Sequence, residues 1–208
     1  MVLDVVTALA GAPAVPPTVP ARDPLSPDDG SYALFTSGST GGPKGVINTH
    51  GGIANRIAWV QDTYHLTRED RVLYKTPASF DVAMWEWLWP LSAGARIMVA
   101  DVGAQRDPVA IARTIRVHGV TVTPFIPSRL RLFTAQPEAR ECHTLRQIVC
   151  SGEELTPTAV DEALEICPAI DNLYGPTEAA IDVTRWACRG GTHPDRPSDL
   201  RRPAAGHR

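Results

Sequence analysis

Short apolar runs alternate with longer amphipathic segments through the middle of the chain. These runs are rich in β-branched and aromatic residues and are bounded by turn residues, which predicts strands at Tyr32–Thr36, Gly45–Asn48, Val72–Lys75, Arg96–Ala100, Val120–Phe125, Leu145–Cys150 and Ala169–Leu173. Helical patterns lie between most of them. Strands that alternate with helices in this way predict an α/β fold with a parallel-dominated sheet and crossover helices.

Two of the intervening helices have clear signals. The segment Pro108–His118 predicts a helix whose buried stripe consists of Val109, Ala112, Ile115 and Arg116. Thr156 followed by Pro157 is typical of an N-cap with proline at the first helical position, so a helix is expected to run to about Ile166.

A tryptophan-rich helix is expected over Val82–Leu91. Asp81 precedes it and fits an N-cap. Trp85, Leu88 and Trp89 fall on one helical face, the usual sign of core packing, and we interpret Trp87 and Trp89 as structural.

Both ends of the chain depart from this pattern. Residues 1–30 include a proline-rich stretch that ends in SPDDGS, and residues 190–208 contain one leucine and four arginines. We expect residues 31–189 to form the folded unit, the first segment to be poorly ordered, and the last to be a disordered or out-of-frame tail.

Composition narrows the class of protein. The 208 residues carry a net charge of -3 and are 43% hydrophobic, which fits a soluble globular protein and not a dedicated nucleic-acid binder. No apolar run is long enough to span a membrane, and no lysine or arginine precedes the apolar N-terminal residues as in a signal peptide. The four cysteines form no CxxC pair, which favours reduced thiols in a cytoplasmic protein.

The stretch TSGSTGGPKG, from Thr36 to Gly45, carries few large side chains and many donors. Successive backbone N–H groups in such a turn form a concave anion site, and the hydroxyls and Lys44 add further donors and charge for a polyphosphate. The alternative is a flexible surface loop. A Walker P-loop is excluded, because Pro43 precedes Lys44 and Gly45 follows it.

The pentapeptide YGPTE, from Tyr174 to Glu178, has a chemistry of its own. Tyr174 offers a ring on which a base can stack, Thr177 a hydroxyl for a phosphate, and Glu178 a carboxylate oxygen for Mg²⁺. The alternative is a β-turn with an exposed acid.

These two stretches, with FDVAMWEWLWPLSAGARI (Phe80–Ile97) between them, resemble in sequence and order the motifs of the adenylate-forming (AMP-binding) synthetases. That family joins a carboxylate to AMP and then passes the acyl group to a thiol. The resemblance extends from Tyr32 to Cys188 and is to the amino-acid-activating adenylation domains of nonribosomal peptide synthetases, which make secondary metabolites. It implies a partial large subdomain of such a domain.

The resemblance implies ATP and Mg²⁺ as cofactors, and as partner a peptidyl carrier protein bearing phosphopantetheine. Thr177 and Glu178 would be catalytic, with Thr177 on the α-phosphate and Glu178 holding Mg²⁺. The implied nucleotide-binding residues are Thr36, Ser37, Gly38, Ser39, Thr40, Gly41, Gly42, Lys44, Gly152, Glu153, Asn172, Tyr174 and Gly175. Gly152 and Glu153 come from CSGEEL, which resembles the loop lining the adenine side.

The family's amino-acid pocket, matched position by position, falls on Asp81, Val82, Trp85, Pro124, Val149, Ser151, Leu173, Ile181 and Asp182. Asp81 would pair with the substrate α-ammonium. The set is a small apolar box that contains a hydroxyl and a carboxylate, and a buried carboxylate without a partner is costly. A short hydroxylated substrate would satisfy it, and the set resembles the family's pattern for serine, with threonine the nearest competitor. The alternative is that Asp182 faces solvent from a strand in AIDVT.

Complete members of the family carry further motifs. Beyond Cys188 we find no segment resembling the ribose-binding motif or the segment with the catalytic lysine, so little activity is expected from these 208 residues alone. Two other readings compete with the adenylation-domain fragment: an acyl- or aryl-CoA ligase fragment, and a non-catalytic nucleotide-binding or interaction module.

Overall fold

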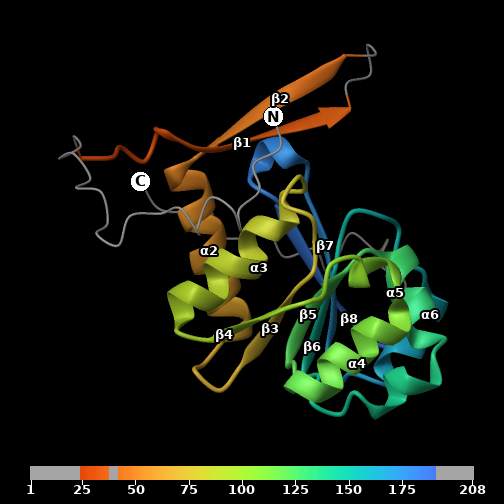
Figure 1. Ribbon diagram of the computed structural model, residues 1–208. Helices are drawn as coiled ribbons and strands as arrows, with labels where there is room; N and C mark the ends of the chain where they lie inside the picture. Colours follow the sequence, from red (N-terminus) through yellow and green to blue (C-terminus); the bar gives the residue numbers. More distant parts are fainter. Residues whose placement is uncertain (1–23, 38–41, 191–208) are drawn as a thin grey trace.

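The computed structural model describes residues 24–37 and 42–190, which form a six-stranded sheet with a protruding hairpin (Figure 1). The sheet order is β4-β3-β5-β6-β7-β8, and every neighbouring pair is parallel except β7 with β8. The strands are β1 (Gly30–Ser37), β2 (Pro43–Thr49), β3 (Arg71–Tyr74), β4 (Arg96–Val99), β5 (Val122–Phe125), β6 (Gln147–Cys150), β7 (Ile170–Tyr174) and β8 (Thr184–Cys188). The predicted parallel-dominated α/β fold is confirmed. The antiparallel strand β8 was not predicted.

Helices cover both faces of the sheet (Figure 1). They are α2 (His50–Tyr64), α3 (Val82–Ala93), α4 (Pro108–His118), α5 (Pro127–Thr134) and α6 (Pro157–Leu164), with short 3-10 turns η1 (Ala104–Arg106), η2 (Pro137–Glu141) and η3 (Thr177–Ala179). One buried cluster joins the sheet to α2 and α3, and a second joins it to α4, α5 and α6. The predicted start of α6 is confirmed, since the Thr156 side chain accepts a hydrogen bond from the N–H of Ala159.

Two details of helix burial differ from the sequence prediction. In α4 the buried residues are Ile111, Ala112 and Ile115, whereas Val109 is 40% exposed and Arg116 forms a surface ion pair with Glu141. The stripe is therefore centred on Ile111 and Ile115, which also lie one helical turn apart.

In α3, Trp89 is fully buried as expected, and its indole N–H donates to Gln61 at 2.8 Å. Trp87 is 38% exposed and lies outside the buried clusters of the described chain, so its interpretation as a core residue was wrong. The reason is its place in the helix, two residues from both Trp85 and Trp89, a spacing that turns a side chain toward the opposite face.

The expectations about the two ends fall largely outside the described residues. Residues 24–29 are exposed and lead into β1 through a turn in which the N–H of Asp29 donates to the carbonyl of Ser26. No helix within the described ranges is long and apolar enough to cross a membrane. All four cysteines are free and buried.

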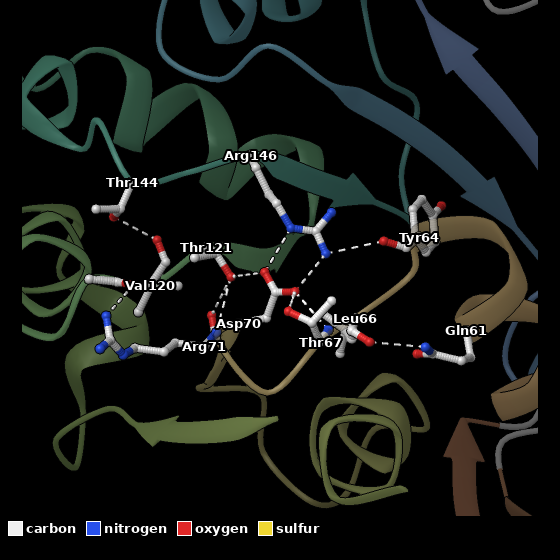
Figure 2. Close-up of polar contacts among 11 residues, drawn as sticks. Gln61, Tyr64, Leu66, Thr67, Asp70, Arg71, Val120, Thr121, Thr144 and Arg146 are labelled. Atoms are coloured by element: carbon white, nitrogen blue, oxygen red, sulfur yellow. Dashed lines mark hydrogen bonds and ion pairs between the residues drawn. The ribbon is translucent and has the colours of Figure 1, made fainter. Parts of the chain in front are cut away.

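A polar cluster around Asp70 joins the amino ends of β3, β5 and β6 (Figure 2). Its carboxylate accepts hydrogen bonds from Arg146 Nε at 2.7 Å and from the Thr121 hydroxyl at 2.7 Å. Burial alone would raise the pKa of Asp70, but the hydrogen bonds from Arg146, Thr67 and Thr121 outweigh it and lower the pKa to about 2. The cluster therefore stabilises the fold when Asp70 is ionised.

Substitution Asp70→Asn is expected to lower the free energy of unfolding at pH 7 by about 2 kcal/mol, because Arg146 loses its charged partner. The Asp70 pKa is lower in the folded chain than in the unfolded chain, so the contribution is present above about pH 4 and is lost as the pH falls toward 2. Chemical denaturation at several pH values measures this. The control Glu165→Gln, which breaks the exposed pair with Arg140, should cost at most about 1 kcal/mol. A cost for Asp70→Asn that does not change between pH 7 and pH 2.5 would contradict the prediction.

Candidate nucleotide and amino-acid site

The two polar motifs of the sequence meet in space. The amino group of Lys44 in β2 lies 2.5 Å from Oε1 of Glu178 in η3. The side-chain amide of Asn48, further along β2, donates to the carbonyl of Thr177 at 2.9 Å. The hairpin that carries the Gly/Ser loop is thus fixed against the YGPTE segment, which follows 134 residues later in the chain.

The predicted nucleotide-binding residues differ in their exposure and in their hydrogen bonds. Tyr174 ends β7 and is 69% exposed, as a stacking surface requires. Asn172, also in β7, has a buried Oδ1 with no hydrogen-bond partner in the described part of the chain. Thr36 lies beside Lys44 across the hairpin, and its hydroxyl donates a hydrogen bond to the Lys44 carbonyl at 3.4 Å. Gly42 is exposed, and Gly38, Ser39, Thr40 and Gly41 lie outside the described residues.

The loop after β6 has a structural role that the sequence did not indicate. The Glu153 carboxylate accepts hydrogen bonds from the backbone N–H and the hydroxyl of Ser128, near the start of α5. Gly152 has φ +87°, a conformation that favours glycine. Glu153 is therefore already paired within the protein.

The segment after YGPTE folds back tightly on itself. A Cβ added at Gly175 would lie 2.5 Å from Cα of Asp182 and 2.6 Å from the carbonyl oxygen of Ile181. Ile181 has φ +84°, which is strained for a β-branched residue. The alternative of a strand in AIDVT was wrong: β8 begins only at Thr184, and Ile181 and Asp182 are both buried.

Substitution Gly175→Ala is expected to displace this segment, because the new methyl group meets backbone atoms that have no room to move. We expect the free energy of unfolding to fall by about 1–3 kcal/mol. The matched control is Gly45→Ala, whose Cβ would meet only the exposed Phe35 ring at 3.4 Å. Equal stability of the two variants in chemical denaturation would contradict the prediction.

Asp81 lies at the start of α3, beside the same junction. Its carboxylate accepts a hydrogen bond from the N–H of Val82 at 2.8 Å, so the N-cap interpretation is confirmed. Burial raises the pKa of Asp81, and a hydrogen bond with Thr177 opposes that rise. The cap uses only Oδ1 of the Asp81 carboxylate, so it does not test the expected contact with a substrate ammonium.

A second acid of α3, Glu86, holds the segment that carries Asp81. It is fully buried and accepts hydrogen bonds from the backbone N–H groups of Lys75 and Thr76, each at 3.0 Å, and from the Thr76 hydroxyl. Sequence reasoning missed this residue. An acid among the tryptophans of an apolar helix was the available signal, because a buried carboxylate needs donors.

Eight of the nine residues predicted to line the amino-acid pocket divide into two groups. Asp81, Val82, Pro124 and Ser151 line a cavity of about 520 Å³ at the carboxyl ends of β3, β5 and β6. Trp85, Val149, Leu173 and Ile181 belong to the buried cluster on the α2 and α3 face. The last residue, Asp182, is buried but polar.

The Asp182 carboxylate has a protein partner that the sequence analysis did not foresee. Its Oδ2 lies 2.7 Å from Nη2 of Arg56 in α2, and each side chain is 3% exposed. The alternative that Asp182 faces solvent is therefore wrong, and so is the premise that its carboxylate is unpartnered. Arg56 falls on the buried stripe of α2 with Ile53, Val60 and Tyr64. A charged residue at that spacing was a signal for a buried counter-charge.

Within the described residues, no group of three or more His, Cys, Asp or Glu side chains is arranged to hold a metal ion. Glu178 is the exposed acid of the junction, and only its Oε1 contacts Lys44. A single exposed carboxylate is compatible with Mg²⁺, which keeps several waters and binds through one or two carboxylates together with substrate phosphates.

Comparison with known proteins identifies the class. The sequence profile of the AMP-binding enzyme family matches residues 3–207, and the chain belongs to this family. The chain is 46% identical over 169 residues to enterobactin synthase component F of Escherichia coli K12, covering 79% of this chain and 13% of that protein.

Solved structures give the same assignment. The nonribosomal peptide synthetase FmoA3, bound to α-methyl-L-serine-AMP, matches with a TM-score of 0.73 and 28% identity, over 79% of this chain and 19% of that one. The Vibrio cholerae adenylation domain AlmE, in complex with glycyl-adenosine-5'-phosphate, matches with a TM-score of 0.73 and 26% identity, over 80% of this chain and 32% of that one. The chain thus corresponds to part of an adenylation domain of the nonribosomal peptide synthetase type.

Proposed function

We propose that this chain forms the nucleotide-binding and amino-acid-selecting part of an adenylation domain that activates L-serine with ATP. The observation that carries the proposal is the contact between β2 and η3, where Lys44 meets Glu178 and Asn48 meets the Thr177 carbonyl. Two motifs with complementary phosphate and metal chemistry, far apart in sequence, form one site.

In the proposed site the Gly/Ser loop and Lys44 bind the phosphates, and Tyr174 stacks on adenine. The exposed ring at the carboxyl end of β7 supports the second role. Glu178 would hold Mg²⁺, which supplies charge neutralisation at the phosphates when bound. Thr177 would donate its hydroxyl to the α-phosphate. Lys44 and Glu178 pair with each other in the structure, and on binding they would exchange that contact for phosphate and metal.

The amino-acid side of the proposal rests on Asp81, Ser151 and Asp182. Asp81 is partly withdrawn from water beside Thr177, so it suits a substrate ammonium near the phosphate site. Ser151 and Asp182 would contact the side-chain hydroxyl. FmoA3 binds α-methyl-L-serine-AMP, a serine derivative, which supports this choice. Threonine is the nearest competitor. The seryl group would then pass to the phosphopantetheine thiol of a peptidyl carrier protein in the cytoplasm.

The nucleotide assignment is tested by titrating the chain with ATP and Mg²⁺. Lys44→Ala should weaken binding by about tenfold, because a charge-assisted contact to a phosphate is lost, and Gly41→Val should weaken it further by obstructing backbone approach. The surface variant Arg116→Met is the control and should bind like the unsubstituted chain. Unchanged affinity in both loop variants would remove the loop from the site.

A further inference from the structure

Arg56 is the most completely buried arginine that the structure describes. Its side chain is 3% exposed, and it lies on the inner stripe of α2. Besides Asp182, it contacts the ring of Trp59, with 4.7 Å between the guanidinium carbon and the ring centroid. The guanidinium is therefore held in one place between an acid and an indole.

The guanidinium has donors to spare. Nη2 donates to Asp182, but Nε and Nη1 are buried and have no hydrogen-bond partner in the described part of the chain. A buried donor without an acceptor costs free energy, so an acceptor from a ligand would stabilise this arrangement.

Asp81 lies close enough to Arg56 and Asp182 for its charge to affect both groups. Burial lowers the pKa of Arg56 and raises the pKa of Asp182. The charge of the Asp81 carboxylate raises the pKa of each of these two groups. With both acids ionised, the three groups carry one net negative charge. A single α-ammonium would neutralise it, whereas a second ammonium on the substrate side chain would face Arg56 with no free carboxylate.

From this geometry we infer that Arg56 is a specificity-determining residue of the amino-acid pocket. It donates from Nε or Nη1 to the side-chain oxygen of the substrate, and that hydroxyl donates to Asp182. Only a group that both donates and accepts can hydrogen-bond to Arg56 and Asp182 at the same time. A methyl side chain leaves Nε and Nη1 of Arg56 without an acceptor, and an aminomethyl side chain is repelled by the guanidinium. This inference rests on the proposed function and adds to it the reason for selecting a hydroxyl.

The test uses the 208-residue chain and three sulfamoyladenosine analogues of the aminoacyl adenylate, with L-seryl, L-alanyl or L-2,3-diaminopropionyl groups. Dissociation constants are measured by calorimetry. The unsubstituted chain should bind the seryl analogue about ten- to a hundredfold more tightly than either of the others, since a hydrogen bond to a charged group is at stake. In Arg56→Met the seryl and alanyl analogues should bind within about threefold of each other, and the diaminopropionyl analogue at least as tightly as the seryl one.

Two further variants complete the design. Arg116→Met, a surface arginine paired with Glu141, should keep the selectivity of the unsubstituted chain. If Arg56→Met does not fold, the role of Arg56 is tested with Arg56→Lys instead. It keeps the charge and should still reject the diaminopropionyl analogue, but it lacks the planar fork and should lose about fivefold of the preference for seryl over alanyl.

The possible failures can be told apart. No binding, or equal binding of all three analogues by the unsubstituted chain, overturns the proposed function and this inference with it. A seryl preference that survives unchanged in Arg56→Met, or in Arg56→Lys where that variant decides, overturns the role of Arg56 and leaves the proposed function standing.

Discussion

Substitution Asp182→Ala is expected to lower the free energy of unfolding by about 3–5 kcal/mol at pH 7, because it leaves the buried Arg56 guanidinium without a counter-charge. The cost of a buried, unpaired charge exceeds the contribution of the pair itself. Arg56 also loses the hydrogen bond that fixes it beside Trp59, and its remaining nitrogens have no partner in the described chain. Chemical denaturation measures the change.

The double variant Arg56→Met/Asp182→Leu separates the unpaired charge from lost packing. Replacing a buried ion pair by apolar residues of similar volume is often neutral or stabilising, so we expect the double variant to recover most of the stability lost in Asp182→Ala. A loss below about 1 kcal/mol in Asp182→Ala, or a double variant as unstable as the single one, would contradict the buried pair.

The second large effect concerns substrate choice. In a complete adenylation domain into which Tyr32–Cys188 is grafted, L-serine should exceed L-alanine by at least about a hundredfold in kcat/KM. A site built to hydrogen-bond a hydroxyl rejects an analogue that lacks it, since its own buried polar groups are left unpaired. L-threonine should be intermediate, because it keeps the hydroxyl but adds a methyl group to a tightly packed region.

Asp182, the acid assigned to the proposed pocket, provides the control for this result. Asp182→Asn keeps the size of the side chain and some hydrogen bonding, so it should reduce the preference for serine over alanine without reversing it. Equal use of serine and alanine by the unsubstituted graft would contradict the assignment of Asp182 and Ser151.

The sequence predicted most of the framework because local signals agreed with the fold. Apolar runs identified seven of the strands, and Thr156 with Pro157 set the start of α6. The order of Gly, Ser, Thr and Lys in TSGSTGGPKG and the YGPTE motif identified the family, which the comparisons confirm.

What the sequence did not predict depends on tertiary packing. A strand through Ile181 and Asp182 was the alternative for this segment, but Ile181 has a positive φ, Gly175 lies close to the backbone of both residues, and both are buried. The partner of Asp182 lies 126 residues away on α2, a helix that the sequence analysis did not single out, and no local pattern joins the two. β8 pairs with β7 in the antiparallel sense at the sheet edge, where the alternation of parallel strands and helices ends.

The claim that this site activates serine is tested most directly by amino-acid-dependent ATP–pyrophosphate exchange in the grafted domain. Serine, threonine, leucine, phenylalanine and a fatty acid are supplied one at a time, and the scaffold carrying its own native segment serves as the reference for activity. We predict that L-serine gives the fastest exchange, with threonine next. Fastest exchange with leucine, phenylalanine or the fatty acid would contradict the claim.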